Sequence, residues 1–338
     1  MNHTNDVIRI ALGIHDPSGN YSRHAGVVMA SIFSNTQSEV VVHILHDSTL
    51  TSQNRMRLEE TADRLHQKVE FIDVTEDIAR LGGKALHTAG RFLSVGCLFR
   101  LLLPDLLPYD KVIYMDCDVL VNLDIQELWN IELEDYCVAG ARDPIAERGK
   151  KIFSRDFVIS KLLGYNLSDY INSGVLLMNL KKIKSLFNLS KEALTYFSRY
   201  PHCAPPTDQN FINTLFHKKT LILEPRFNRN STTRGDEYAI LHVMGKPKPW
   251  DGFNEELASR LYWKFYALTG WKTEILDAVL DTAFNSTLNH RKTSQCYNRI
   301  FGRIRKDLGF CVKKTTAILS ILFIEALYRL RAFLGGAK

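Results

Sequence analysis

Short runs of apolar, often β-branched residues alternate with longer mixed segments along the first part of the chain. Four of these runs predict strands: Ile8–Leu12, Val40–Leu45, Val69–Val74 and Lys111–Met115. The last run is apolar enough to be buried on both faces, as expected in the interior of a parallel sheet. Strands that alternate with helical segments predict the α/β class with a mixed, mostly parallel sheet.

The segments between these runs carry helical patterns. Thr51–Leu65 is charged on one side and apolar on the other, and Thr51 or Ser52 can act as its N-cap. Leu93–Leu107 predicts a second helix that ends near a proline, and Ile125–Trp129 predicts a short one with Asp124 as its cap. Helices of this kind are expected to cover the faces of the sheet.

The second half of the chain contains weaker signals. Tyr170–Leu180 predicts a strand region interrupted by Asn172-Ser173-Gly174, Glu224–Asn228 predicts a loop, and Ile240–Val243 predicts a last short strand. From Glu255 onward the pattern is helical, first rich in aromatic and then in basic residues. We therefore divide the chain into a domain at residues 1–270 and a helical extension at residues 271–338.

The composition fits an ordinary globular protein, with 45% hydrophobic and 24% charged residues among 338. Six cysteines occur without any C-x-x-C pair, which argues against a structural zinc site and against a disulfide framework. The polar start of the chain predicts neither a signal peptide nor a membrane span. These features favour a cytoplasmic location.

The positive charge is concentrated at the C-terminal end. Residues 299–338 carry nine basic and two acidic side chains, a net charge of +7 in a chain whose total is +6. Only ten uncharged residues lie between Lys314 and Glu325, too few for a membrane-spanning helix. The tail therefore predicts either an interfacial helix on anionic lipid or a helix packed on the body, and no nucleic-acid partner is expected.

Two carboxylates follow the strand Lys111–Met115. Ligands of open α/β sheets bind at the carboxyl ends of strands, so Asp116 and Asp118 occur where a site is expected. If the chain stays extended there, both side chains face the same way. Hard oxygen ligands beside a diphosphate suit Mg²⁺ or Mn²⁺, although such aspartates can also simply cap a turn.

Three further segments offer suitable chemistry. His242 ends the predicted strand Ile240–Val243, and Gly245 and Lys248 follow it. An imidazole added to two carboxylates favours Mn²⁺ over Mg²⁺, a glycine lets the backbone approach a phosphate, and a lysine can bind one. Thr207–Asn210 and Tyr170–Gly174 supply polar groups for a sugar ring, or else helix caps and turns.

Taken together, these motifs resemble the retaining glycosyltransferases of family eight, especially the bacterial lipopolysaccharide and lipooligosaccharide glucosyl- and galactosyltransferases. The resemblance covers roughly residues 8–270. It implies a Rossmann-like nucleotide-sugar-binding domain of the GT-A type with a helical C-terminal extension. It also implies that Asp116, Asp118 and His242 ligate Mn²⁺, with Mg²⁺ as the alternative.

The resemblance further implies a set of residues around a UDP-hexose donor. These are Gly13, His15, Asp16, Asn20, Tyr21, Arg100, Asp116, Cys117, Asp118, Asp143, Asn172, Ser173, Asp208, Gln209, His242, Gly245 and Lys248. The chain departs from the family pattern twice. The tyrosine of the family's Tyr-x-Arg segment is missing before Arg100, and the base-binding loop at His15–Tyr21 is about three residues longer than usual. Whether His15, Asp16 or Asn20 contacts the base stays open.

The implied reaction is transfer of glucose or galactose, with retention, to a saccharide acceptor such as a lipid-linked cell-surface glycan. Lys248 would stabilise the leaving diphosphate, and Asp208 and Gln209 would position the sugar. Retention commonly uses a carboxylate nucleophile, and glutamine is a poor one, so we favour front-side attack by the acceptor hydroxyl. With a lipid-linked acceptor, the protein is expected at the cytoplasmic face of the inner membrane.

Three alternatives use the same residues differently. A glycosyltransferase of this kind could act on a protein or another acceptor. An apolar strand followed by Asp-x-Asp also opens aspartyl-phosphate phosphatases, but Leu120 stands where they carry threonine or valine. A glycan- or membrane-binding protein with an inactive site is disfavoured because both aspartates, His242 and Lys248 are present.

Overall fold

A computed structural model describes residues 7–82, 95–144, 160–161, 163–199, 207–230, 239–251 and 256–274 of the chain. The chain divides into two compact units, Met1–Gly270 and Trp271–Lys338. The basic tail and its predicted interfacial helix lie outside the described residues. Within those described residues, every helix is too short or too polar to cross a bilayer.

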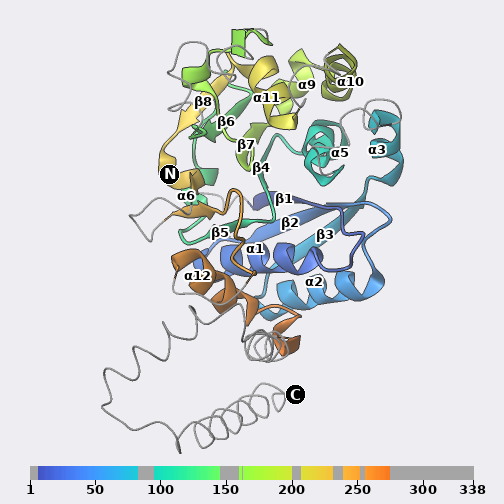
Figure 1. The fold of residues 1–338 in the computed structure, drawn as a ribbon, viewed down its shortest axis with the longest axis vertical. Helices are drawn as coiled ribbons and strands as arrows, with labels where there is room; N and C mark the ends of the chain where they lie inside the picture. Colours follow the sequence, from blue (N-terminus) through green and yellow to red (C-terminus); the bar gives the residue numbers. More distant parts are fainter. Residues whose placement is uncertain are drawn as a thin grey trace, which may run out of the picture. The chain divides into compact units, whose positions relative to one another are not determined.

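The first unit is built around a seven-stranded sheet with the order β3-β2-β1-β4-β7-β6-β8 (Figure 1). Its strands are β1 Ile8–Ile14, β2 Val40–His46, β3 Lys68–Asp73, β4 Lys111–Met115, β6 Val138–Ala141, β7 Val175–Asn179 and β8 Thr220–Leu223. Strands β3, β2, β1 and β4 are parallel, whereas β7 runs antiparallel to both of its neighbours. The sheet is thus mixed and mostly parallel, as the sequence predicts.

A second, small sheet has the order β5-β10-β9. It consists of β5 Val119–Val121, β10 Ile240–His242 and β9 Arg229–Asn230. Strand β5 begins only a few residues after β4, so the chain passes directly from the large sheet into the small one. Strand β10 pairs antiparallel with β5 and parallel with β9, which joins segments more than one hundred residues apart in sequence.

Helices cover both faces of the large sheet. On one face α1 Ser22–Asn35 packs against α2 Ser52–Arg64 and α12 Leu257–Tyr266 (Figure 1). The large apolar core that includes Phe99, Leu102, Val112, Leu176 and Phe216 joins the sheet to η1 Val95–Leu102 and α11 Asp208–Phe216. Other helices are α3 Thr75–Gly82, α5 Leu103–Leu106, α6 Gln126–Trp129, η2 Leu167–Asp169, α9 Leu180–Leu186, α10 Leu189–Arg199, η3 Pro225–Asn228 and η4 Lys272–Glu274.

Several sequence predictions are confirmed in detail. Strand β4 spans the predicted residues, and β1 and β2 extend their predictions by two residues and one residue at the C-terminal end. Helix α2 has Thr51 as its N-cap, whose hydroxyl accepts a hydrogen bond from the backbone N–H of Asn54. At α6 the Asp124 carboxylate accepts from the backbone N–H of Gln126, although Ile125 is the residue at the cap position.

Other predictions need correction. The helix predicted at Leu93–Leu107 is a 3₁₀ segment from Val95 followed by the short helix α5, and its first two residues lie outside the described part. The loop at Glu224–Asn228 contains the 3₁₀ helix η3, and the strand predicted from Tyr170 begins only at Val175. Helix α1 had no clear amphipathic pattern because residues on nearly all of its sides are buried, from Ser22 to Phe33.

Candidate functional site

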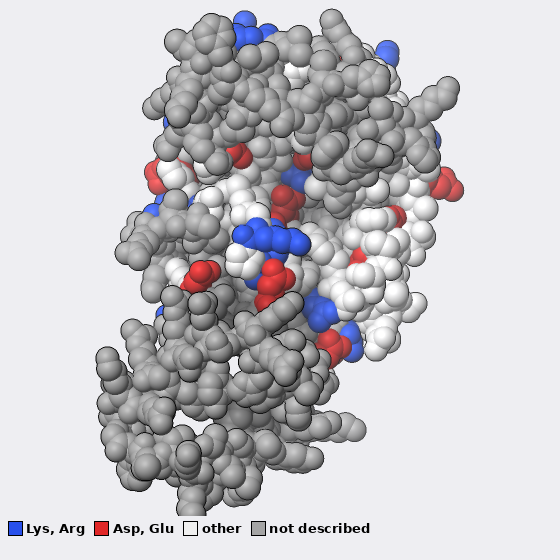
Figure 2. All heavy atoms as spheres, viewed as in Figure 1, with Lys and Arg blue, Asp and Glu red and all other residues white. Residues whose placement is uncertain are grey.

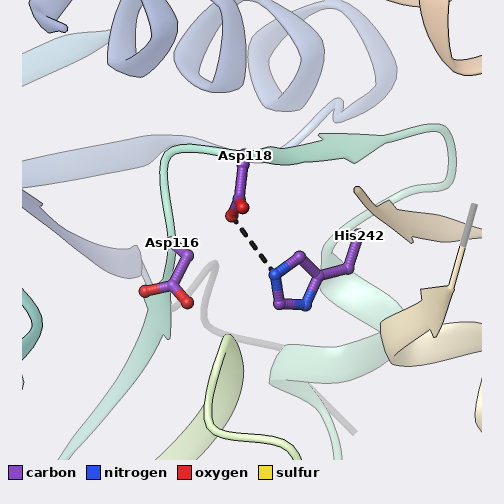
Figure 3. A group of neighbouring side chains, drawn as sticks. All are labelled: Asp116, Asp118 and His242. Atoms are coloured by element: carbon purple, nitrogen blue, oxygen red, sulfur yellow. Dashed lines mark ion pairs between the residues drawn. The ribbon is translucent and has the colours of Figure 1, made fainter. Parts of the chain in front are cut away.

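Asp116, Asp118 and His242 form a cluster of side chains that could hold a metal ion (Figure 3). One potential ligand atom from each residue lies within 4.8 Å of the others. The two aspartates come from the connection between β4 and β5, and the histidine ends β10. Residues more than one hundred positions apart in sequence therefore converge at the carboxyl end of β4, as expected for an open α/β sheet.

The convergence comes from strand pairing and not from an extended Asp-x-Asp segment. The chain turns at residues 117–118, so the extended geometry considered for the two carboxylates is not present. In the register of the small sheet, Val119 faces His242, and the backbone N–H of Val243 donates to the carbonyl of Asp118 at 3.0 Å. This pairing holds the imidazole against the carboxylate.

The donor set fits a divalent cation. His242 is buried, with 5% of its surface exposed, and its Nδ1 lies 3.0 Å from the Asn228 Oδ1. An amide oxygen only accepts hydrogen bonds, so Nδ1 carries the proton and Nε2 keeps a lone pair. That lone pair lies 3.2 Å from a carboxylate oxygen of Asp118. Two acceptors facing each other repel, and either a proton on Nε2 or a shared cation removes the repulsion.

Gly174 is required by the close packing of this cluster. A Cβ atom at this position would lie 2.2 Å from Cε1 of His242 and 2.9 Å from Oδ2 of Asp116. Its carbonyl accepts a hydrogen bond from the backbone N–H of Asp116 at 2.8 Å. Any side chain at residue 174 would therefore displace two of the three potential ligands.

Arg100 lies buried behind the cluster, with 1% of its surface exposed. Its guanidinium contacts Asp116 at 2.7 Å and Asp208 at 3.1 Å, and it donates to the backbone carbonyls of Cys97 and Ser173. Burial opposes its charge, yet the two carboxylates raise the pKa of Arg100 above its usual value. Arg100 thus connects the segment after β4, which carries Asp116, to the start of α11, which carries Asp208.

Lys248 faces the cluster from the loop after β10. Its ammonium lies 2.7 Å from Asp118 and 2.6 Å from the carbonyl of Val243. Burial alone would raise the pKa of Asp118, but a hydrogen bond and charge from the protonated form of His242, followed by the charge of Lys248, lower it well below its usual value. Asp118 is therefore ionised. Figure 2 shows acidic and basic side chains close together near the middle of the face viewed.

Aromatic stacking fixes the loop that carries Lys248. Trp250 stacks on His24 of α1 with ring centroids 3.7 Å apart, and Nδ1 of His24 lies 2.8 Å from the Tyr262 hydroxyl. Gly245 occupies the left-handed region at φ +86°, which a glycine adopts without strain. The loop is thereby attached to both α1 and α12.

A second polar group lies next to the cluster, at the start of α11. Gln209 donates from Nε2 to Asp143 at 3.1 Å and accepts at Oε1 from the backbone N–H of Ser173 at 3.0 Å. Asn172 donates to the same Asp143 oxygen at 2.9 Å. Asp208 is buried against Arg100, and burial raises its pKa despite that cation. The residues predicted to hold a sugar are thus brought together.

The loop after β1 separates its three candidate base contacts. Asp16 accepts from the backbone N–H groups of Tyr21 and Ser22 and from the Ser22 hydroxyl, so it serves as a cap for α1. Burial alone would raise the pKa of Asp16, but these hydrogen bonds lower it below its usual value. Asn20 bonds to Arg23 and to the Ser18 carbonyl.

Of the three candidates, His15 is the one whose imidazole remains partly exposed. Its Nδ1 lies 2.5 Å from Asp47, which follows the neighbouring strand β2, and its side chain is 26% exposed. Strand β1 pairs with β4, so the end of β1 lies beside the connection that carries the aspartates. His15 can therefore present Nε2 to a ligand bound at the metal cluster.

The other side of the connection between β4 and β5 is lined by Gly13, Cys117 and Tyr21. The thiol of Cys117 is buried and donates to the carbonyl of Gly13 at 3.5 Å, so its side chain faces the interior. A Cβ at Gly13 would approach the carbonyl of Gly96 to 2.9 Å. Burial and the charges of residues 116–118 raise the pKa of the Tyr21 phenol far above its usual range. Tyr21 remains a neutral hydroxyl.

Comparison with known proteins identifies the family. The model of glycosyl transferase family 8 matches residues 14–253, which include every residue of the site except Gly13. The chain is a family 8 glycosyltransferase. This assignment selects the glycosyltransferase prediction over the phosphatase alternative.

Relatives of this family 8 glycosyltransferase are distant in sequence. General stress protein A of Bacillus subtilis (strain 168) is 24% identical over 282 residues, 75% of this chain and 92% of that protein. The lipopolysaccharide 1,2-glucosyltransferase of Escherichia coli (strain K12) is 24% identical over 279 residues, 73% of this chain and 74% of that enzyme. The chain spans between 29% and 50% of the length of three streptococcal glycosyltransferases.

Solved structures share the fold of the family 8 glycosyltransferase. The galactosyltransferase LgtC, crystallised with donor and acceptor sugar analogs, superposes with a TM-score of 0.63 at 23% identity. The superposition covers 78% of this chain and 99% of that one. This likeness confirms the predicted GT-A type of fold.

Sequence reasoning missed several residues of the family 8 site. Asn228 orients His242, and Asp47 orients His15. Asn228 and Asp47 follow no obvious motif, and the loop prediction for Glu224–Asn228 gave no reason to select one residue. Asp47 directly follows β2, so the rule that ligands bind at strand ends could have found it.

Proposed function

We propose that this enzyme transfers glucose or galactose from a UDP-sugar to a saccharide acceptor, with retention of configuration at the anomeric carbon. The observation that carries the proposal is the cluster of Asp116, Asp118 and His242 beside the ammonium of Lys248. Such a group suits the diphosphate of a nucleotide sugar, and the polar residues around Gln209 lie next to it.

Asp116, Asp118 and His242 would hold the metal. One imidazole with two carboxylates favours Mn²⁺, and Mg²⁺ is the alternative. When bound, the ion supplies Lewis-acid stabilisation of the charge on the leaving diphosphate. Lys248 adds a second positive charge at the same place, where it is already held by Asp118 and by the carbonyl of Val243.

The polar groups of the sugar site favour front-side attack. Asp208 is buried in an ion pair with Arg100, and both ends of the Gln209 amide are engaged by Asp143 and Ser173. Neither offers a free carboxylate to an anomeric carbon. The bond from that carbon to the diphosphate breaks, the acceptor oxygen bonds to the same face, and its proton passes to the departing phosphate oxygen. Gln209 and Asp208 position the sugar.

His15 is the proposed contact of the nucleotide base. Asp47 only accepts hydrogen bonds, so Nδ1 of a neutral His15 carries the proton and Nε2 is an acceptor. Uracil presents an N–H donor at its N3 position, whereas cytosine presents an acceptor there. The pair of His15 and Asp47 therefore favours UDP over CDP, while Asp16 and Asn20 are engaged elsewhere.

A lipid-linked cell-surface glycan is the proposed acceptor, and the cytoplasmic face of the inner membrane is the proposed location. The name of the lipopolysaccharide 1,2-glucosyltransferase relative supports the acceptor, and the basic composition of residues 299–338 supports an anionic membrane surface. Deletion of residues 291–338 should then release the protein from membranes without ending donor hydrolysis.

The decisive experiment is a panel of nucleotide sugars assayed with Mn²⁺, with Mg²⁺ and with EDTA, using Asp118→Ala as the matched control. We expect turnover of UDP-glucose or UDP-galactose that depends on the metal and is absent from the variant. Analysis of the product by NMR should give the retained anomer. Full turnover in EDTA, unaffected turnover by Asp118→Ala or an inverted product would each contradict the corresponding part of the proposal.

A further inference from the structure

A continuous chain of hydrogen bonds joins the sugar end of the site to the metal cluster. Gln209 and Asn172 both donate to one carboxylate oxygen of Asp143, at 3.1 and 2.9 Å. Asn228 donates from Nδ2 to Oδ1 of Asn172 at 2.9 Å, and His242 Nδ1 lies 3.0 Å from Oδ1 of Asn228. Five side chains from five separate segments thus form one network.

The direction of the bonds in this chain is fixed at Asn172, whose amide donates to the carboxylate of Asp143 and whose oxygen accepts from the backbone N–H of Gly174 at 2.9 Å. A carboxylate only accepts, so Asp143 draws the NH₂ group of Asn172 toward itself and turns the carbonyl oxygen toward Asn228. That oxygen draws the NH₂ group of Asn228, whose own oxygen then faces His242. The imidazole must therefore carry its proton on Nδ1, which leaves Nε2 as the lone pair toward Asp118.

The network is shielded from water, so the direction in which its side chains donate and accept hydrogen bonds is difficult to reverse. Asn172, Asn228 and His242 are exposed by only 5–6%, and Asp143 by 9%. A buried amide turned the wrong way would leave two facing acceptors and two facing donors, each without a partner. A solvent molecule cannot easily substitute for the missing partner at such positions.

We infer that Asn228 is a positioning residue that transmits the orientation of Asn172, held by Asp143 and by the backbone N–H of Gly174, to His242 and thereby selects the ligating tautomer of the imidazole. The inference rests on the proposed metal site and extends it to residues that do not touch the ion. Partners of a ligating histidine commonly set its orientation and basicity. The same network couples the two ends of the site, since a sugar bound at Asp143 and a cation bound at His242 act on one set of hydrogen bonds.

Mn²⁺ binding, measured from the EPR signal of the free ion without any donor, tests the inference. Asn228→Leu removes both hydrogen bonds and should weaken Mn²⁺ binding about 10- to 100-fold. Asn228→Asp still accepts from Nδ1 of His242 and should keep Mn²⁺ affinity within about threefold of the original protein. Asn188→Leu, an exposed asparagine near α10, is the matched control and should bind Mn²⁺ unchanged.

Asp143→Asn provides an independent test that does not depend on the folding of the leucine variant. Residue 143 reaches the imidazole through the amides of Asn172 and Asn228, so weaker Mn²⁺ binding by this variant supports the transmission, whereas unchanged binding contradicts a role for Asp143 and assigns the orientation of Asn172 to the backbone N–H of Gly174. In Asn228→Asp the donor to Asn172 is lost, so addition of UDP-hexose should no longer tighten Mn²⁺ binding more than UDP alone does.

The outcomes separate this inference from the proposed function. If the original protein binds Mn²⁺ and the Asn228→Leu variant binds it equally well, the positioning role of Asn228 is wrong while the metal site stands. Equal losses in Asn228→Asp and Asn228→Leu would also contradict it, because the aspartate keeps the acceptor. If the original protein binds no divalent ion, the proposed metal site itself is wrong.

Discussion

The guanidinium of Arg100 lies 2.7 Å from the carboxylate of Asp116 and occupies its Oδ1 atom. The hydroxyl of Tyr114 donates to the same oxygen at 2.9 Å. Oδ1 of Asp116 therefore faces Arg100 and Tyr114 in the interior. The other oxygen, Oδ2, faces the cluster, because it is the atom that a Cβ on Gly174, beside His242, would contact. A buried cation therefore decides which atom of Asp116 faces the cluster.

Replacement of Arg100 by methionine should destabilise the fold. The change leaves Asp116 and Asp208 close together without their cation, and breaking a buried ion pair costs about 3–5 kcal/mol. Urea denaturation should show this loss in the free energy of unfolding. Asp208→Asn in the same background should recover part of it, because one uncompensated charge disappears. Additive losses in the double variant would show that the two residues do not interact.

Gly174→Ala should inactivate the enzyme while leaving most of the fold in place. The new methyl group would overlap His242 and press on Asp116, so the potential ligands must separate. We expect kcat/KM for the preferred UDP-hexose to fall at least about 100-fold, equal to about 2.7 kcal/mol of lost transition-state stabilisation. Circular dichroism serves as the control for folding. An alanine variant with normal Mn²⁺ affinity would contradict the close packing described here.

Stability should fall at acidic pH because of His24. The usual pKa of histidine is 6.5, and burial, with a smaller effect of the Arg23 charge, lowers the pKa of His24 to about 3. Between these values the unfolded chain binds the proton and the folded chain does not. The free energy of unfolding therefore decreases as pH falls, by about 1.4 kcal/mol per pH unit from this residue.

The variant His24→Gln isolates this contribution. It should be less stable than the original protein at pH 7, because the stack with Trp250 is lost, but its stability should depend less steeply on pH between 6 and 4. The pKa of buried His43 is also lowered by burial, but this residue is present in both proteins, so its effect cancels in the comparison. Parallel curves for the two proteins would contradict the prediction.

His15→Ala should weaken recognition of the nucleotide base. Loss of one hydrogen bond to N3 of uracil costs about 1 kcal/mol, so KM for the UDP-sugar should rise about fivefold to tenfold with little change in kcat. The preference for UDP over CDP in competition assays should shrink by a similar factor. His217→Ala, at the far end of α11, is the control. Undiminished UDP preference in His15→Ala would show that another residue reads the base.

The sequence predicts the parts of the site that follow local rules. Asp116 and Asp118 are found because an apolar strand leads directly to them, and His242 because it ends another such run. The α/β class and the mostly parallel sheet follow from the alternation of strands and helices. Helix α1 escapes prediction because its buried surroundings remove the periodic contrast between apolar and polar positions.

What the sequence cannot predict are contacts that depend on long-range pairing. Asn228 acquires its role only when β9 and β10 lie side by side, and Gly174 only when β10 reaches the end of β4. No local pattern encodes these distances. Asp208 likewise resembles an ordinary first-turn acidic residue, until Arg100 from another helix is placed beside it.

The antiparallel pairing of β5 with β10 has a consequence for how the protein is made. Val119 and His242 are partners in this register, so the imidazole reaches Asp118 only after the ribosome has produced residues far beyond the aspartates. A nascent chain that ends soon after β4 contains Asp116 and Asp118 but lacks His242, the third potential ligand. If the proposed metal site is required for activity, the growing polypeptide stays inert toward activated sugars until nearly all of its first unit has been synthesised.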